Sequence, residues 1–242
     1  MIMAAMATMP ERSPYLAEAV KAIRPQVDTL RVYLNNFDGI PDCLTPEEVI
    51  FSQEAAGDLC AEGKFYWYDR EEGKNHSHYL TIDDDLYYPP DYVERLKEEY
   101  DARRGQAVVG LHGYVFDDPI TSYVYSRKEY YGFDKALDTP KPVHILGTNT
   151  VLLGHEALSL TLDNFPRRNT SDLQLAVVAQ KLRVPLISVP RPENWVQENR
   201  PATAEGFSIW KEAKADGGRA KAELARRAIA NWQLFPDPLH KD

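Results

Sequence analysis

One stretch of the sequence, residues 78–93, reads His-Tyr-Leu-Thr-Ile-Asp-Asp-Asp-Leu-Tyr-Tyr-Pro-Pro-Asp-Tyr-Val. Its aromatic and β-branched run, Tyr79 to Ile82, predicts a buried strand. That strand ends in three consecutive aspartates at positions 83–85. Pro89 and Pro90 then turn the chain, and Pro90 suits the first turn of a helix that is expected to follow Asp91.

Three adjacent carboxylates at the end of a buried strand repel one another and lose solvation. A hard divalent cation with oxygen ligands offsets that cost, and such a cation commonly also binds phosphates. Ligands of open α/β sheets gather at the carboxyl ends of the strands. The three aspartates therefore favour a metal–diphosphate site. Acidic residues after a strand also occur as solvated turns or helix caps, and Asp91 fits that second description.

The residues before this stretch predict an α/β fold with a mostly parallel sheet flanked by helices. Residues 2–8 form an apolar strand, residues 15–23 a helix with one apolar face, and residues 30–34 a second strand. Strand, helix and strand in the first 35 residues are the opening of a parallel sheet.

Polar residues follow the first two of these strands. They are Thr8, Arg12, Asn35 and Asp38, and the strand ends would bring them to one edge of the sheet. A nucleoside could lie there. Asn and Asp before Gly are also ordinary turn formers, so a plain turn is the alternative.

The later chain continues the alternation of strands and helices. Strands are expected at 49–52, 107–111, 144–153 (interrupted at Gly147) and 186–189, helices at 57–68 and 173–182, and a small antiparallel excursion within 117–139. Lys64 in the first helix would reach a diphosphate as a point charge or else lie solvated. Thr170, Ser171 and Asp172 are expected to cap the second helix.

Composition narrows the class of protein. The 242 residues predict one domain over 1–198 with a helical C-terminal extension, 199–242, packed on the domain or on a partner. Within the extension, residues 203–232 are expected to be helical with a break at Gly217 and Gly218. A net charge of -9 argues against a general nucleic-acid binder. Cys43 and Cys60 form no metal or disulfide pattern. Without a signal peptide or an apolar run as long as a membrane span, the expected location is cytoplasmic.

Several short segments, in order along residues 1–196, carry a resemblance to a known family. They are Thr8-Met9-Pro10-Glu11-Arg12, Val-Tyr-Leu-Asn-Asn at 32–36, Gly57-Asp58, Gly63-Lys64-Phe65, residues 79–93, Val-Val-Gly-Leu-His-Gly at 108–113, His-Ile-Leu-Gly-Thr-Asn-Thr at 144–150 and Arg-Pro-Glu-Asn-Trp at 191–195. Together they resemble the GT-A glycosyltransferases of the family-two-like kind, which build bacterial or viral surface polysaccharides. The Asp-x-Asp pair is specific here because of its place after the central strand.

The resemblance implies roles for individual residues. Residues that would contact the nucleotide-sugar are Thr8, Pro10, Arg12, Asn35 or Asp38, Asp58, Lys64, Asp83 and Asp84. Asp83 and Asp85 would be the metal ligands, and Asp172 the general base. The sequence departs from the family pattern at Ser171, where many relatives carry a second acidic residue. A third metal ligand, often a late histidine, is not identifiable among His112, His144 and His155.

The implied reaction is metal-dependent, inverting transfer of a sugar from a UDP-, GDP- or dTDP-linked donor to a hydroxyl of a glycan or lipid-linked acceptor, with Mn²⁺ or Mg²⁺ as cofactor. The sequence leaves open whether the chain forms a homo-oligomer. One alternative is a sugar-nucleotide nucleotidyltransferase, but the turn at residues 9–12 lacks the glycines of its phosphate loop. The other is a non-catalytic carbohydrate-binding module of the same fold.

Overall fold

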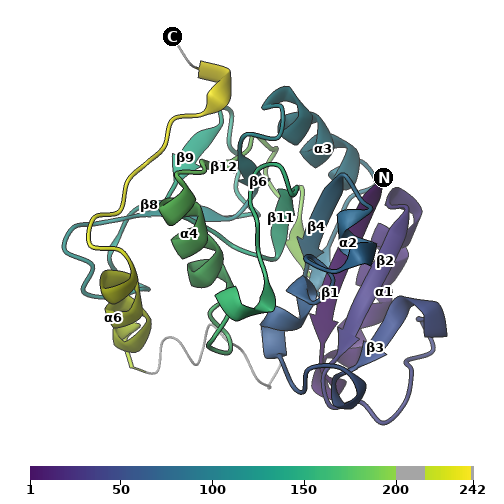
Figure 1. Cartoon of the computed structure of the whole chain (residues 1–242). Coiled ribbons are helices and arrows are strands. Elements are labelled where there is room, and N and C mark those ends of the chain that lie inside the picture. Colours follow the sequence, from purple (N-terminus) through teal and green to yellow (C-terminus); the bar gives the residue numbers. More distant parts are fainter. Residues whose placement is uncertain (200–215, 241–242) are drawn as a thin grey trace.

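The computed structural model of the chain describes residues 1–199 and 216–240, and Figure 1 shows how its elements are arranged. The strands are β1 (Ile2–Thr8), β2 (Thr29–Leu34), β3 (Val49–Phe51), β4 (His78–Ile82), β5 (Leu86–Tyr87), β6 (Val108–Gly110), β7 (Gly113–Phe116), β8 (Arg127–Tyr131), β9 (Lys141–Val143), β10 (Ile145–Leu146), β11 (Thr150–Leu153), β12 (Leu186–Ser188) and β13 (Gln197–Glu198). The α-helices are α1 (Ser13–Ile23), α2 (Glu71–Lys74), α3 (Tyr92–Ala102), α4 (Ser171–Leu182) and α6 (Arg219–Ala228). Short 3-10 helices include η1 (Pro10–Arg12) and η5 (Cys60–Phe65).

The main sheet has eight strands in the order β3-β2-β1-β4-β11-β6-β12-β9. β1, β2, β3 and β4 pair in parallel, as do β6 and β12. β11 runs antiparallel to both of its neighbours, β4 and β6, and β9 runs antiparallel to β12 at the edge. The fold is therefore α/β with a mostly parallel sheet, as the sequence predicts.

Side chains along the central strands alternate between two hydrophobic cores, one on each face of the sheet. In β1, Met3 and Ala5 belong to one core, and Ala4 and Met6 to the other. The second core includes the apolar faces of α1 and α3, whereas the first includes residues of α4, α6 and η5. Burial on both faces is why these strands consist of continuous apolar runs.

Two smaller sheets lie outside the main one. β10, β7 and β8 form an antiparallel sheet, which confirms the predicted excursion. β5 pairs with β13 and so joins the residues after the aspartates to the end of the first described segment. The predicted break at Gly147 is also present: it separates β10 in the small sheet from β11 in the main one.

Two predicted helices differ from the observed structure. Residues 57–68 form only the short helix η5 and turns, because Cys60 has a positive φ of 51° and Gly63 packs against the ring of Tyr33. In the C-terminal extension, the predicted helix begins at residue 203, and its part up to residue 215 lies outside the described residues. Beyond the predicted break at Gly217 and Gly218, α6 ends at Ala228 instead of continuing to Trp232.

The described part of the extension packs on the body of the protein. α6 lies beside α4 (Figure 1) and contributes the buried side chains of Ala222 and Ala225 to the first core. Farther along, Asp237 forms a buried ion pair with Arg103 after α3, at 2.6 Å. Among the helices of residues 1–199 and 216–240, none has the length and apolar character that a membrane crossing requires.

The buried ion pair predicts a measurable loss of stability. Among the described residues, Asp237→Ala leaves the fully buried Arg103 guanidinium with only its contacts to Glu99. Removal of one partner of such a pair costs about 3 kcal/mol in the free energy of unfolding, measured by urea denaturation. The exposed Arg227, paired with Glu223, provides the control: Arg227→Ala should leave the unfolding midpoint unchanged. Equal midpoints for wild type and Asp237→Ala would contradict the role of the pair.

Candidate active site

A cavity of about 360 Å³ opens at the edge of the sheet where β1 and β4 end. Its lining comes from segments far apart in the sequence: 7–12, Asn35, 60–64, 83–86, 112–133, 147–149, 169–172, Glu198 and Lys221. β11 begins at this same edge because it runs antiparallel to β4, with Thr150 opposite Ile82. The fold thus gathers polar residues from both halves of the chain around one hollow.

The three aspartates line this cavity, and each is paired with a cation of the chain. Arg12 Nε contacts Asp84 Oδ1 at 2.6 Å, and Arg12 Nη2 contacts Asp85 Oδ2 at 2.5 Å. Lys64 Nζ forms an ion pair with Asp83. Mutual repulsion among the carboxylates is therefore offset by one guanidinium and one ammonium.

Burial and the attraction between opposite charges act against each other on the pKa values of Asp84 and Arg12. Asp84 is 1% exposed, and loss of hydration raises its pKa to about 6 although Arg12 draws it down. Burial opposes the charge of Arg12, but attraction to Asp84, Asp85 and Asp83 raises the pKa of its guanidinium above the ordinary value. The arginine stays charged and holds its two carboxylate partners.

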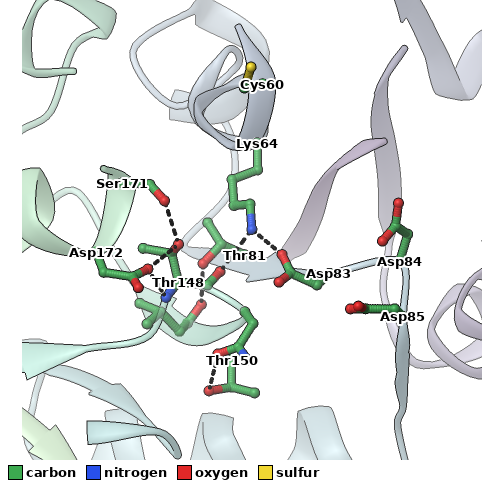
Figure 2. Close-up of polar contacts among 12 residues, drawn as sticks. Cys60, Lys64, Thr81, Asp83, Asp84, Asp85, Thr148, Thr150, Ser171 and Asp172 are labelled. Carbon is green, nitrogen blue, oxygen red and sulfur yellow. Dashed lines mark hydrogen bonds and ion pairs between the residues drawn. The ribbon is translucent and has the colours of Figure 1, made fainter. Parts of the chain in front are cut away.

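Lys64 is almost fully buried, at 2% exposure, and reaches across the site from η5 (Figure 2). Besides its ion pair with Asp83, its ammonium donates to the carbonyl oxygen of Thr148 at 3.4 Å. It therefore joins the aspartates after β4 to the loop between β10 and β11. The solvated alternative that the sequence left open for Lys64 is wrong.

Asp172, in the first turn of α4, lies on the other side of the Lys64 ammonium (Figure 2). Its Oδ1 accepts hydrogen bonds from the backbone N–H and the Oγ1 hydroxyl of Thr148, both at 2.8 Å. The same hydroxyl lies 2.9 Å from Ser171 Oγ. Thr170, which precedes the helix, makes no side-chain capping bond. The cap predicted from Thr170, Ser171 and Asp172 is thus replaced by contacts to Thr148, which orient the Asp172 carboxylate.

Glu62 fixes the loop that leads into α4. Its side chain is 2% exposed and accepts from the backbone N–H groups of Asn169 at 3.0 Å and Thr170 at 2.7 Å. Burial raises its pKa, against these backbone hydrogen bonds. Glu62 and Lys64 are both in η5. This short helix therefore contacts both the loop before α4 and the aspartates after β4.

The cavity contains most, but not all, of the residues predicted to form the site. Those that line it are Thr8, Arg12, Asn35, Lys64, Asp83, Asp84, Asp85 and Asp172, whereas Pro10, Asp38 and Asp58 are outside the lining. The Asn35 amide is used within the protein, since it donates to Thr8 and Cys60 carbonyls and accepts from Leu59 N–H.

Asp58 likewise makes its contacts within the protein. It accepts from Asn36 Nδ2 and from the backbone N–H of Cys60, and it forms an ion pair with Arg168. That ion pair connects the 57–60 segment to the loop before α4. In the structure, Asp58 therefore stabilises two segments beside the cavity, 57–60 and the loop before α4.

Several lining residues were not among the sequence candidates for the site. They include Thr148, Tyr114, Tyr123, Arg127, Tyr130, Phe133, Glu198 and Lys221. The predicted interruption at Gly147 lies next to Thr148 in the sequence. The segment 117–139 is rich in aromatic residues, which is a weaker signal because aromatic residues at such spacing usually form core. Nothing in the sequence pattern joins Lys221 to the site.

Among the three histidines considered as a third metal ligand, only His112 lines the cavity. Burial lowers its pKa to about 4, so the ring is neutral near pH 7, and its buried Nδ1 has no hydrogen-bond partner within the described chain. His144 Nδ1 accepts from the backbone N–H of Phe116, and His155 lies against Tyr68 and Gly73. Neither His144 nor His155 lines the cavity.

The acidic residues suit a divalent cation that shares its coordination with a ligand. Within residues 1–199 and 216–240, no three His, Cys, Asp or Glu side chains form a complete metal cluster. Mg²⁺ sites, however, commonly need only one or two carboxylates together with substrate phosphates. Asp83 and Asp85 both line the cavity and offer hard oxygen atoms to it. These two residues therefore fit a divalent cation.

The architecture is an α/β fold with a mostly parallel eight-stranded sheet. A solved structure similar to this chain is that of S. aureus TarS 1-349 in complex with UDP-GlcNAc, with a TM-score of 0.59 and 11% sequence identity. The likeness covers 97% of this chain and 68% of TarS 1-349, and at this identity it shows the fold alone. Neither the known protein families nor the curated protein sequences contain a match to this chain.

The buried Glu62 gives a prediction about this site. Glu62→Gln keeps the size of the side chain but replaces one acceptor oxygen by an NH₂ group, which faces a backbone N–H. We expect the free energy of unfolding to fall by about 1–3 kcal/mol, the cost of a buried unsatisfied donor, and amide hydrogen exchange at 169–172 to accelerate. Glu71→Gln, at an exposed position in α2, serves as the control. Unchanged exchange at 169–172 would show that Glu62 does not hold this loop.

Proposed function

We propose that this chain is a metal-dependent, inverting glycosyltransferase that moves a sugar from a nucleoside-diphosphate donor to an acceptor hydroxyl. One observation carries the proposal: a single cavity is lined by the aspartates after β4 and by an oriented carboxylate, Asp172, on the other side of Lys64. The likeness of the fold to a protein solved with UDP-GlcNAc supports it.

The donor would lie along the edge formed by β1 and β4. Thr8 and the backbone around Asn35 border the nucleoside end of the cavity, and Asp83 and Asp85 would hold Mn²⁺ or Mg²⁺ beside the diphosphate. When bound, the cation stabilises the charge that develops on the leaving diphosphate. Arg12 and Lys64 already lie among these carboxylates and add two positive charges at the place where the diphosphate would lie.

Asp172 would act as the general base. Thr148 uses Oδ1 of this carboxylate, and Oδ2 makes no hydrogen bond within the described part of the chain. Oδ2 would accept the proton of the acceptor hydroxyl as its oxygen attacks the anomeric carbon. The bond from that carbon to the diphosphate oxygen breaks on the opposite face, and the configuration inverts. Placement of base and leaving group on two sides of one cavity suits such a single displacement.

The two alternatives from the sequence differ in measurable ways. A nucleotidyltransferase would release pyrophosphate from a nucleoside triphosphate and a sugar phosphate. A carbohydrate-binding module would bind glycans without turnover of a nucleotide-sugar. Hydrolysis or transfer from UDP-, GDP- or dTDP-linked sugars with Mn²⁺, with release of the nucleoside diphosphate, supports the proposed class over both.

The role of Asp172 is tested by its amide variant. Asp172→Asn removes the proton acceptor but keeps the shape of the side chain, so we expect kcat for sugar transfer to fall by about 10²–10⁴-fold with nucleotide affinity retained. Asp163→Asn, near α4 but outside the cavity lining, is the matched control. Near-normal transfer by folded Asp172→Asn would exclude this residue as the base.

The role of Asp85 is tested by binding. In calorimetry of UDP with and without Mn²⁺, wild type should bind UDP more tightly with the cation, whereas Asp85→Asn should lose this difference. Asp42→Asn, at an exposed position away from the cavity, should behave like wild type. An undiminished effect of Mn²⁺ in Asp85→Asn would show that the cation, if it binds, is held elsewhere.

A further inference from the structure

Arg12 binds two neighbouring aspartates at once, and the two halves of this contact differ in burial. Its Nε contacts Asp84 Oδ1 at 2.6 Å, and its Nη2 contacts Asp85 Oδ2 at 2.5 Å. Asp84 is almost completely buried, whereas the side chains of Asp85 and Arg12 are 18% and 20% exposed. The guanidinium therefore joins a buried carboxylate to one that a ligand in the cavity can reach.

The backbone of the three aspartates is fixed by contacts that do not involve Arg12. The carbonyl of Asp85 accepts from the backbone N–H of Asn199 at 2.7 Å, and β5, which follows Asp85, pairs with β13. At the other end, the backbone N–H of Asp83 donates to the Tyr88 hydroxyl at 2.8 Å. A change of partner at Asp85 therefore needs only a movement of side chains.

Of the two cations beside the aspartates, Arg12 is the one that can release a carboxylate. The Lys64 ammonium binds both Asp83 and the carbonyl of Thr148 (Figure 2), and its side chain is buried. Within the described chain, the Arg12 side chain forms ion pairs only with Asp84 and Asp85. Its Nη2 group can therefore leave Asp85 without the loss of any other ion pair.

Release of Asp85 keeps the buried half of the contact. A carboxylate that loses its partner in the interior of a protein is strongly destabilising, so Arg12 Nε stays on Asp84. Asp85 is partly exposed, and separation of such a pair costs much less. A turn of the guanidinium about its contact with Asp84 thus frees Asp85 at a smaller cost than any movement that also frees Asp84.

Arg12 and a divalent cation compete for Asp85. A guanidinium and a metal ion at the same carboxylate repel each other, so the contact with Nη2 opposes binding of the cation. A diphosphate removes this opposition, because phosphate oxygens accept charge-assisted hydrogen bonds from a guanidinium. The cation in turn neutralises Asp85 and binds the diphosphate. Each ligand therefore removes an electrostatic obstacle to the other.

We propose that Arg12 closes Asp85 to a divalent cation until a diphosphate draws the Nη2 group away, so that cation and diphosphate bind cooperatively. This rests on the proposed function and adds the regulation of the same site. The cation alone has to displace Arg12, and the diphosphate alone meets three carboxylates. Both ligands together leave every carboxylate of the group with a positive partner.

The test measures the two ligands separately on the full chain. Calorimetry gives the affinity for Mn²⁺ with and without UDP, corrected for the Mn²⁺–UDP complex in solution, and the affinity for UDP without Mn²⁺. In Arg12→Met, we expect Mn²⁺ alone to bind about tenfold more tightly than in wild type, because the competing positive charge is gone. UDP alone should bind more weakly, and the increase in Mn²⁺ affinity caused by UDP should be about tenfold smaller.

Further variants assign the effect to the contact between Arg12 and Asp85. Arg24→Met removes the same charge outside the cavity, where Arg24 pairs with Glu48, and should behave like wild type. Asp85→Asn added to Arg12→Met should cancel the gain in Mn²⁺ affinity. Arg12→Lys keeps a charge for Asp84 but lacks the second N–H group of the fork. It should show a smaller gain, and it takes the place of Arg12→Met if that variant does not fold.

The outcomes that overturn the proposal differ from those that overturn the proposed function. If wild type binds UDP more tightly with Mn²⁺ but the folded Arg12 variant shows no gain in affinity for Mn²⁺ alone, the role of Arg12 is wrong and the donor site stands. A gain that persists in the double variant with Asp85→Asn leads to the same conclusion. If UDP with Mn²⁺ does not bind wild type, the proposed function is wrong, and the role of Arg12 is overturned with it.

Discussion

The neutralisation of three consecutive aspartates at the end of a central strand is the constraint on which the site depends. Asp84 is almost completely buried, and its neighbours share its edge of the sheet. Two cations from distant segments, Arg12 and Lys64, bind the three carboxylates. Arg12 follows the first strand, and Lys64 belongs to η5. The three adjacent carboxylates are therefore neutralised by two segments, 10–12 and η5, that lie far apart in the sequence.

The same contacts continue from the aspartates to the other side of the site. Lys64 also contacts Thr148, and Thr148 donates two hydrogen bonds to Asp172 (Figure 2). Glu62 holds the start of the loop into α4 from the same short helix. A chain of direct contacts thus spans the distance between the carboxylates proposed to bind the donor and the proposed base.

The sequence predicted much of the fold because its signals were local. The buried strand at 79–82, the small-residue strand at the start and the break at Gly147 follow from hydrophobic period and turn chemistry. η5 was predicted as a longer helix because the positive φ of Cys60 and the packing of Gly63 on Tyr33 depend on tertiary contacts. The local pattern gave Asp172 only as a helix cap, and its role as the base came from the family resemblance; its partner Thr148 lies 24 residues away. Lys221 had no local signal, since only the docking of α6 brings it to the cavity.

The most direct test of the account is a crystal structure of the chain with Mn²⁺ and UDP. The account predicts density for a cation on Asp85 and for the diphosphate between it and Lys64, with the Arg12 guanidinium turned from Asp85 toward a phosphate oxygen. A cavity that stays free of both ligands at saturating concentrations, with Arg12 still bridging Asp84 and Asp85, would contradict it.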